Sequence, residues 1–184
     1  MKPSTFISIP SVFTPSECDA LVAHAQSLPS ARAQVINTRR PSRLSLYRRC
    51  SVTWLPPGPH TDHVYMRLWQ HALALNPTLW NFDLQTIRSL QYLDYGPLNY
   101  FARHIDNGSP SVSRRLLSIS VQLSPPTDFV GGKLRIWGTS PSGLRHALSD
   151  QGSITIFPSH LWHQANPVWW GHRRSLIAWV ESDD

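Results

Sequence analysis

From Leu84 onward the sequence breaks into short stretches in which apolar and polar residues alternate, separated by glycine, proline, serine and asparagine. Successive side chains of a β-strand point to opposite faces, so this period of two is typical of strands with one buried face. Several such strands in close succession indicate an antiparallel sandwich or barrel. The predicted strands are Ile87–Leu93, Phe101–Asp106, Leu116–Leu123, Lys133–Trp137, Gly152–Phe157, His160–His163 and Arg173–Val180.

The residues before this region predict a short strand and two helices. Phe6–Val12 is strand-like, and Thr14-Pro15-Ser16-Glu17 has the pattern of a helix start with a capping box. A second helix opens at Thr61 or Asp62, with apolar residues at helical spacing. A chain of 184 residues fits one domain. We therefore predict a single α+β, mainly β domain over residues 1–184, with helical support in 1–83 and the β core in 84–184.

The composition is that of a globular protein, with 41% hydrophobic and 15% charged residues. The net charge of +6 favours anionic partners such as nucleic acid, a ribosomal surface or an acidic protein. The excess is partly local, because five arginines fall within Asn37–Arg49. Cys18 and Cys50 could form one disulfide but do not require it. With no signal-like or membrane-length apolar run, we expect a cytoplasmic protein without membrane association.

The segment His104-Ile105-Asp106 places an imidazole and a carboxylate two residues apart. On a strand these side chains would project from the same face. His160 and His163 follow much later in the chain. Two histidines and one carboxylate on one side of a metal ion form a facial triad, which leaves positions open for other ligands. The pattern therefore indicates a candidate iron site.

Ten residues after His163 stands Arg173, at the start of a predicted strand. Alternation would put Arg173, Ser175, Ile177 and Trp179 on one face of that strand. A guanidinium aimed into a protein interior requires an anion, and its planar fork suits a carboxylate. Arg173 is therefore a candidate carboxylate-binding residue.

The C-terminal half resembles the prolyl 4-hydroxylase-like branch of the Fe(II)/2-oxoglutarate-dependent dioxygenases. Leu90–Asp106, with its Tyr95-Gly96-Pro97 turn, is similar to the strand pair that leads to the family's His-x-Asp motif. Gly131–Ile136 resembles its Gly-Gly-x-Leu strand start, and Gly152–His163 its stretch ending in the distal histidine. Arg173–Trp179 resembles its arginine strand. The resemblance spans about residues 84–181, and it implies a double-stranded β-helix, a jelly-roll or cupin-like barrel with N-terminal helices packed on one sheet.

The resemblance makes His104, Asp106 and His163 the catalytic iron ligands. It makes Arg173 the residue that binds the distal carboxylate of 2-oxoglutarate, with Ser175 and Tyr95 as helpers. Gln122 falls where the animal oxygen-sensing prolyl hydroxylases carry a tyrosine, and we include it among the co-substrate residues. Fe(II), 2-oxoglutarate and O2 are the implied cofactors, with succinate and CO2 as co-products.

Some neighbouring residues compete for these roles. The ten-residue step favours the pair His163 and Arg173 over their neighbours His160 and Arg174. The segment His60–His63 (HTDH) could hold another metal, but its position at a helix start makes ordinary capping the preferred interpretation.

The resemblance implies hydroxylation of a protein or peptide side chain, with proline the commonest target in the branch. The alternatives are hydroxylation of a free amino acid or other small metabolite, demethylation of nucleic-acid bases, and a barrel that only binds. Dioxygenases that demethylate bases carry a second arginine six residues after the first, where this chain has Trp179. We expect Trp179 to contact the substrate. Arg39, Arg40 and Arg43 lie where the branch carries a finger loop, and we expect them to recruit an acidic or phosphate-bearing substrate.

Overall fold

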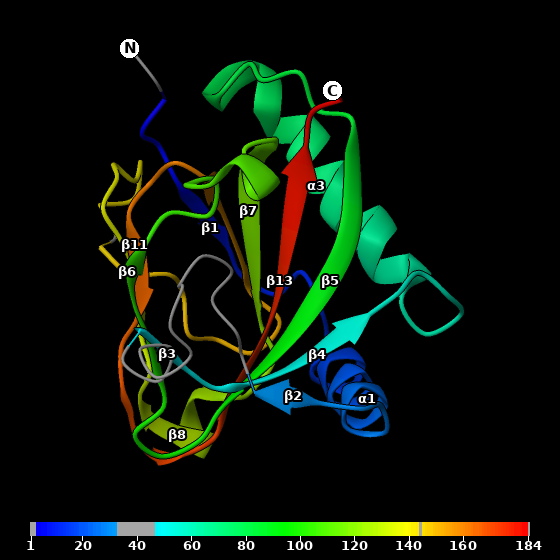
Figure 1. The fold of residues 1–184 in the computed structure, drawn as a ribbon, viewed down its shortest axis with the longest axis vertical. Coiled ribbons are helices and arrows are strands. Elements are labelled where there is room, and N and C mark those ends of the chain that lie inside the picture. The colour runs from blue at the N-terminus through cyan, green and yellow to red at the C-terminus, as the bar shows by residue number, and fades with distance from the viewer. Residues whose placement is uncertain (1–2, 33–46, 144, 184) are drawn as a thin grey trace.

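The computed structural model describes residues 3–32, 47–143 and 145–183 of the chain (Figure 1). Its helices are α1 (Pro15–Gln26) and α3 (Asp62–Leu79), with short 3-10 helices at Pro110–Val112 and Pro126–Asp128. Its strands are β1 (Ile7–Ile9), β2 (Ala31–Arg32), β3 (Arg48–Arg49), β4 (Ser51–Leu55), β5 (Thr86–Tyr95), β6 (Tyr100–His104), β7 (Arg115–Gln122), β8 (Phe129–Gly131), β9 (Leu134–Ile136), β10 (Ile154–Pro158), β11 (His163–Ala165), β12 (Val168–Gly171) and β13 (Arg173–Glu181).

The described strands form two main sheets and a short ribbon. The larger sheet has the order β1-β10-β7-β13-β5-β4-β2, the smaller has β3-β6-β11-β9, and β12 pairs with β8. Every pairing within these sheets is antiparallel. The sheets lie on opposite sides of the interior and remain separate (Figure 1). The predicted mainly β, antiparallel architecture is confirmed, as two facing sheets rather than a closed barrel.

Helix α1 begins with the predicted capping box. The Thr14 hydroxyl accepts a hydrogen bond from the Glu17 backbone N–H at 3.2 Å, and the Glu17 carboxylate accepts one from the Thr14 N–H at 2.8 Å. The other carboxylate oxygen of Glu17 pairs with Arg67 of α3 at 2.8 Å. The same guanidinium donates to the Val12 carbonyl at 3.0 Å, so Arg67 joins the two helices to the chain that precedes α1.

Both helices pack against the larger sheet, as predicted (Figure 1). Their buried faces carry apolar side chains that repeat at helical spacing. These apolar helix residues pack against every second side chain of β7, β10 and β13 and form one core with them. The side chains of these three strands that line the cavity are not part of this core. The residues in contact include Cys18, Leu21, Ala25, Val64, Leu68, Ala72, Leu117, Ile119, Val121, Leu176, Ala178 and Val180.

The opposite faces of the same strands line the interior. Arg173, Ser175, Ile177 and Trp179 of β13 all border one cavity, and Ser120 of β7 joins them. The alternation of β13 predicted from the sequence is therefore confirmed. It separates a helix-covered apolar face from a face of mixed polar and apolar side chains that borders the cavity.

Two predicted strands differ from the structure around the candidate metal ligands. Strand β6 ends at His104, and Asp106 follows in a turn. The backbone N–H of Asp106 donates to the Ser159 carbonyl at 2.9 Å. Strand β11 begins only at His163, because the residues from Ser159 to Leu161 form a turn closed by the Leu161 N–H and the Pro158 carbonyl. The prediction that Asp106 lies on the strand of His104 is therefore wrong, although both side chains reach the same place.

The chain passes from the smaller to the larger sheet at Cys50, the single residue between β3 and β4. Strand β3 is an edge strand of the smaller sheet, and β2 is an edge strand of the larger. Cys50 and Cys18 are both buried and free, so they form no disulfide.

Among the described residues, neither helix combines the length and the apolar character needed to cross a membrane. The cytoplasmic location and the single domain over residues 1–184 remain predictions.

The Glu17 contacts predict a pH-dependent contribution to stability. Its hydrogen bonds with Arg67 and Thr14 lower the pKa of Glu17 from 4.5 to about 2. A carboxyl with a depressed folded-state pKa stabilises the protein above its unfolded pKa and loses that effect as the pH falls through the folded value. We expect Glu17→Gln to lower the free energy of unfolding by about 1 kcal/mol at pH 7. In urea denaturation, the difference from the parent protein should vanish between pH 4.5 and 2. Arg67→Gln should reproduce most of this effect, and a difference that persists at pH 2 would contradict the assignment.

Candidate metal centre and its cavity

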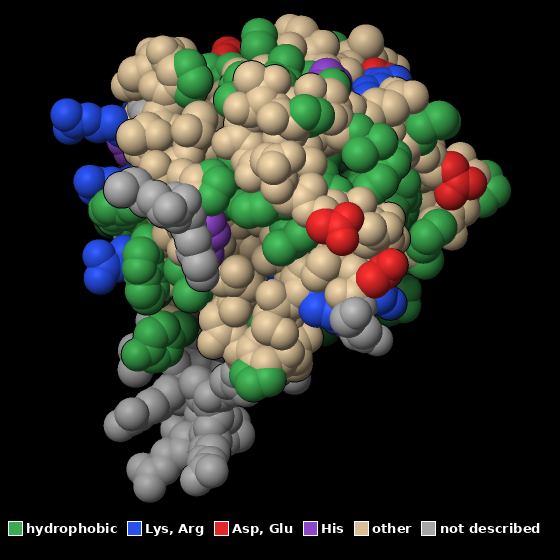
Figure 2. All heavy atoms as spheres, turned by 90° about the horizontal axis from the view of Figure 1, so that it is seen from above, with side chains coloured by type: hydrophobic (Ala, Val, Ile, Leu, Met, Phe, Trp, Pro, Cys, Tyr) green, Lys and Arg blue, Asp and Glu red, His purple; other side chains and the backbone are tan. Residues whose placement is uncertain are grey.

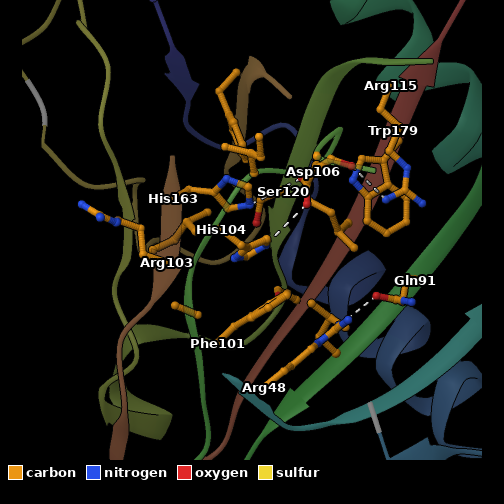
Figure 3. A pocket seen from close by; sticks show the side chains of 18 of the residues that line it. Arg48, Gln91, Phe101, Arg103, His104, Asp106, Arg115, Ser120, His163 and Trp179 are labelled. Atoms are coloured by element: carbon orange, nitrogen blue, oxygen red, sulfur yellow. Dashed lines mark hydrogen bonds and ion pairs between the residues drawn. The ribbon is translucent and has the colours of Figure 1, made fainter. Parts of the chain in front are cut away.

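His104, Asp106 and His163 bring three metal-binding side chains together in the interior (Figure 3). Antiparallel pairing of β6 and β11 sets His163 directly opposite His104, and Asp106 approaches from the turn after β6. One donor atom from each residue lies within 4.8 Å of the others. The Asp106 carboxylate is 3.4 Å from Nε2 of His104 and 3.5 Å from Nε2 of His163. The structure thus assembles the predicted triad and leaves His160 out of it.

Backbone carbonyls orient both imidazoles. Nδ1 of His104 lies 2.8 Å from the Ala102 carbonyl, and Nδ1 of His163 lies 2.9 Å from the Leu161 carbonyl. A carbonyl oxygen only accepts hydrogen bonds, so each Nδ1 carries a proton and each neutral ring keeps its Nε2 lone pair for a metal.

A serine from β7 holds the carboxylate. The Ser118 hydroxyl donates to Oδ2 of Asp106 at 2.6 Å and lies 2.9 Å from the Ser159 hydroxyl. Ser118 and Ser159 are fully buried. Since the Asp106 backbone is also bonded to Ser159, the carboxylate has little freedom to turn away from the histidines.

The charges of the three residues depend on one another. Burial, together with the nearby His163, lowers the pKa of His104. Burial opposes charge on His163 as well, but the Asp106 carboxylate raises the pKa of that imidazole above its ordinary value. Burial likewise disfavours the Asp106 anion, yet the two imidazoles hold its pKa well below the usual range. Asp106 is therefore an anion, as metal binding requires.

These donors fit Fe(II). Two imidazole nitrogens and one carboxylate, all offered from one side, are the ligand set of a non-haem iron facial triad. The hydrogen bonds from Nδ1 to carbonyls and from Ser118 to Asp106 are the outer contacts that such ligands use. Among the residues that the structure describes, no other group of three such side chains converges in this way.

Arg173 lies in the same cavity as the triad, with 5% of its surface exposed. Its side chain contacts the Ser175 hydroxyl at 3.5 Å and lies 5.9 Å from the centre of the Tyr95 ring. Within the described part of the chain, no carboxylate lies within ion-pair distance of it, and burial lowers its pKa. Such a guanidinium requires an anionic partner, and a ligand carboxylate would provide one.

Gly132 makes room for this arginine. It has a φ of +62°, and an added Cβ would lie 2.9 Å from the Val168 side chain and 3.0 Å from Cδ of Arg173. A side chain at this position would displace the stem of Arg173. Of the Gly-Gly pair noted in the sequence, Gly132 is thus required by the packing of the arginine, whereas Gly131 lies against Pro167 and Trp169.

The cavity has a volume of about 430 Å³ and is bordered by both sheets. Its lining includes the predicted residues Tyr95, Ser175 and Trp179 but does not include Gln122. The amide of Gln122 is buried beside β7 and donates to the Ser124 carbonyl at 2.9 Å. The structure therefore does not bring Gln122 to the candidate site. Arg39, Arg40 and Arg43 lie outside the described residues.

The competing residues have other contacts. Nε2 of His160 lies 2.9 Å from the Pro3 carbonyl, and Nε of Arg174 lies 3.6 Å from the Asp94 carboxylate. In the HTDH segment, Asp62 accepts a hydrogen bond from the Gly58 N–H at 2.7 Å, and His60 packs against His24. These contacts agree with the preference for His163 and Arg173. The expected side-chain cap at the start of α3 is not observed, because the N-cap residue Thr61 makes no capping hydrogen bond and Asp62 bonds to Gly58, outside the helix.

The sequence did not indicate the role of Phe101. Its ring stacks on the His104 imidazole, with centres 3.5 Å apart and planes 15° from parallel. Residues three apart on a regular strand face opposite ways. Here β6 is irregular. Phe101 and His104 are three positions apart, but their partners in β11, Ala165 and His163, are only two positions apart. This bulge places both rings on the cavity side.

Part of the positive charge lies beside tryptophan rings, on and next to the smaller sheet. Arg103 lies 5.1 Å from the Trp162 ring and 5.6 Å from the Trp137 ring, and Arg135 lies 4.6 Å from the Trp137 ring. Figure 2 shows basic and hydrophobic side chains interleaved along the left edge of the molecule. The basic character is thus not confined to Asn37–Arg49.

Comparison with known proteins gives one family. Residues 90–181 match the model of the 2OG-Fe(II) oxygenase superfamily. A PKHD-type hydroxylase of Idiomarina loihiensis is 40% identical over 83 residues, which cover 45% of this chain and 37% of that protein. A PKHD-type hydroxylase of Prochlorococcus marinus is 30% identical over 119 residues, covering 64% of this chain and 53% of that protein. The chain therefore spans about half the length of these relatives or less.

Solved structures share the fold. A Pseudomonas putida prolyl-4-hydroxylase superposes with a TM-score of 0.77 at 20% identity, covering 97% of this chain and 93% of that one. A prolyl hydroxylase from Trichoplax adhaerens, in complex with a peptide fragment of the hypoxia inducible factor oxygen degradation domain, has a TM-score of 0.76 at 16% identity. It covers 97% of this chain and 84% of that chain.

The contact between Ser118 and Asp106 predicts an effect on metal affinity. Ser118→Ala would remove a hydrogen bond from the carboxylate ligand, and lost contacts of this kind weaken metal binding by about 10- to 100-fold. Ser120→Ala is the matched control, since Ser120 lies on the same face of β7 and, among the described residues, only Ser118 of this strand is hydrogen-bonded to a triad residue. Anaerobic titration with Fe(II), or with Mn(II) as a probe, measures both. Equal affinities of the two variants would contradict a supporting role for Ser118.

Proposed function

The chain belongs to the 2OG-Fe(II) oxygenase superfamily, and we propose that it uses Fe(II), 2-oxoglutarate and O2 to hydroxylate a side chain of a protein or peptide, with succinate and CO2 as co-products. One observation carries this proposal. The convergent metal ligands border the same cavity as Arg173, which is buried and has no carboxylate partner among the described residues. 2-Oxoglutarate would connect the two sites, because its distal carboxylate would supply the anion that Arg173 requires and its other end would bind the metal held by the triad.

In this proposal, His104, Asp106 and His163 hold the metal and Arg173 binds the distal carboxylate of 2-oxoglutarate. Ser175 and Tyr95 border the cavity beside Arg173 and would position the same carboxylate. Bound Fe(II) would supply the site at which the co-substrate and O2 react and the oxidising power for attack on a C–H bond. The apolar wall formed by Leu93, Phe101 and Ile177 would exclude water from the reacting groups.

The side of the cavity next to Trp179 suits a peptide. The Arg115 guanidinium lies 3.7 Å from the centre of the Trp179 ring (Figure 3). Trp54, half exposed, lies 6.3 Å from the same ring. Nε1 of Trp179 is buried without a hydrogen-bond partner among the described residues. A peptide carbonyl would satisfy that donor, and the ring would pack against a proline or aliphatic side chain. The names of the PKHD-type and prolyl hydroxylases support this assignment.

Substitutions of Arg173 and of the metal ligand His104 should have different effects, the first on the KM for 2-oxoglutarate and the second on metal binding. Arg173→Gln would remove a charge-assisted hydrogen-bond partner worth about 1.5–3 kcal/mol, so we expect the KM for 2-oxoglutarate to rise by about 10- to 100-fold. His104→Ala should abolish both metal binding and succinate formation. Arg174→Gln and His160→Ala are the matched controls, because both residues make contacts away from the triad. Succinate formation by the His104→Ala variant would contradict the metal assignment.

The substrate class requires a separate measurement. Active enzyme and the His104→Ala control are incubated with lysate, and polypeptides and metabolites are both searched by mass spectrometry for one added oxygen atom. We expect the modification on a polypeptide, only with active enzyme. Oxidation of a small metabolite alone would replace the peptide assignment with the alternative hydroxylase, and loss of a methyl group from nucleic acid would indicate a demethylase.

A further inference from the structure

Arg48 of β3 is an arginine in the cavity that the proposed function does not use. Three other arginines border the same space, and each has a described environment or role. Arg173 is assigned to 2-oxoglutarate, Arg115 lies 3.8 Å from the Glu181 carboxylate, and Arg103 lies against the rings of Trp137 and Trp162. Arg48 instead points into the cavity from the wall next to Phe101 (Figure 3).

Neutral groups hold the Arg48 guanidinium. One of its terminal nitrogens donates to the side-chain oxygen of Gln91 at 2.9 Å, and Nε donates to Sγ of Cys50 at 3.3 Å. Its centre lies 4.6 Å from the centre of the Phe101 ring. Gln91 and Cys50 are 5% and 6% exposed, and burial raises the pKa of the Cys50 thiol, so this thiol carries no charge at neutral pH. These contacts fix the orientation of the guanidinium without neutralising it.

No carboxylate of the described residues lies within ion-pair distance of Arg48. The adjoining residues 33–46 contain no aspartate or glutamate in the sequence. Burial opposes the charge of Arg48. The Asp106 carboxylate is among the groups that raise the pKa of Arg48, but it is already committed to the two histidines. A half-buried guanidinium without a counter-charge is costly, so an anion from outside the chain would stabilise it.

The proposed co-substrate has no carboxylate left for this position. Of its two carboxylates, one is assigned to Arg173 and the other to the metal, so a further anion must come from the substrate. The Phe101 ring lies between the Arg48 guanidinium and the His104 imidazole. An anion bound by Arg48 would therefore lie one aromatic ring away from a metal ligand, close to the reacting carbon.

We propose that Arg48, oriented by Gln91, Cys50 and Phe101, binds a carboxylate of the substrate and selects substrates that carry one. This inference rests on the proposed function. The carboxylate comes either from an aspartate or glutamate next to the hydroxylated residue or from a free α-carboxylate. The planar guanidinium distinguishes a carboxylate from an amide of the same shape, because only the anion balances its charge.

Matched peptide pools test this selection. One pool of blocked proline-containing peptides carries Asp and Glu beside the proline, and the other carries Asn and Gln at those positions. A third pool has neutral side chains and a free C-terminal carboxylate. Each is titrated under argon into protein loaded with Mn(II) and 2-oxoglutarate, so that Arg173 is already occupied. Hydroxylation of the same pools is then measured by mass spectrometry with Fe(II) and O2.

We expect at least tenfold tighter binding of one of the carboxylate pools than of the amide pool. Arg48→Gln should abolish this preference while leaving the KM for 2-oxoglutarate unchanged, and Arg48→Lys should retain part of it. Gln91→Glu should also abolish it, because the introduced carboxylate would occupy the guanidinium. The matched control is Arg49→Gln, which removes the same charge from the neighbouring, exposed residue of β3 and should retain the preference.

Several outcomes would overturn the inference. Equal binding of the three pools, or binding of none, would show that Arg48 selects no carboxylate. A raised KM for 2-oxoglutarate in Arg48→Gln would assign this arginine to the co-substrate instead. Loss of the preference in Arg49→Gln would indicate general electrostatic attraction. Failure of the proposed function is distinguishable. Without the proposed iron and co-substrate chemistry, the protein would not take up Mn(II) and 2-oxoglutarate in the loading step, and a different substrate class would appear in the lysate experiment.

Discussion

The pairing of β11 with β6 sets His163 opposite His104, and the chemistry of the interior depends on this register. A shift of one residue would turn one imidazole out of the cavity, since adjacent strand residues face opposite ways. The two ring Nδ1 atoms are fixed by carbonyls two residues earlier in the chain, so the same backbone also decides which nitrogen faces Asp106. The larger sheet has a parallel role, because the alternation of β13 directs Arg173 inward and Leu176 toward the helices.

Features that follow from local periodicity were predictable from the sequence. The capping box at Thr14 and the two faces of β13 depend on residues close together in the chain, and both are observed. Asp106 and Phe101 were harder, because their positions depend on a strand end and a bulge that only pairing with β11 creates. The alternation of β7 predicts that Gln122 faces the cavity. Its side-chain amide instead donates a hydrogen bond to the Ser124 carbonyl, and Gln122 does not line the cavity. Arg48 was recognisable only once Gln91 and Phe101, distant in sequence, lay beside it.

The interior of this protein keeps charges that most cores exclude. Asp106 is stabilised as an anion by the two imidazoles, whereas Arg173 and Arg48 lack carboxylates among the described residues. Buried charges of this kind lower the stability of the unliganded protein and are offset when a ligand neutralises them. The apolar contacts between helices and larger sheet, remote from the cavity, supply the stability that tolerates this arrangement. In β7, β10 and β13, one face therefore packs against the helices and stabilises the fold, whereas the other face borders the cavity.

The chain enters residues 33–46 from β2, an edge strand of the larger sheet, and leaves them at β3, an edge strand of the smaller sheet. Among the described strands, β2 pairs only with β4 and β3 only with β6. A change in the length of the chain between β2 and β3 would therefore break no other described strand pairing. Insertions and deletions at this point would thus leave the triad and Arg173 in register. Evolution could therefore vary the length of this one connection while the metal ligands and Arg173 keep their positions.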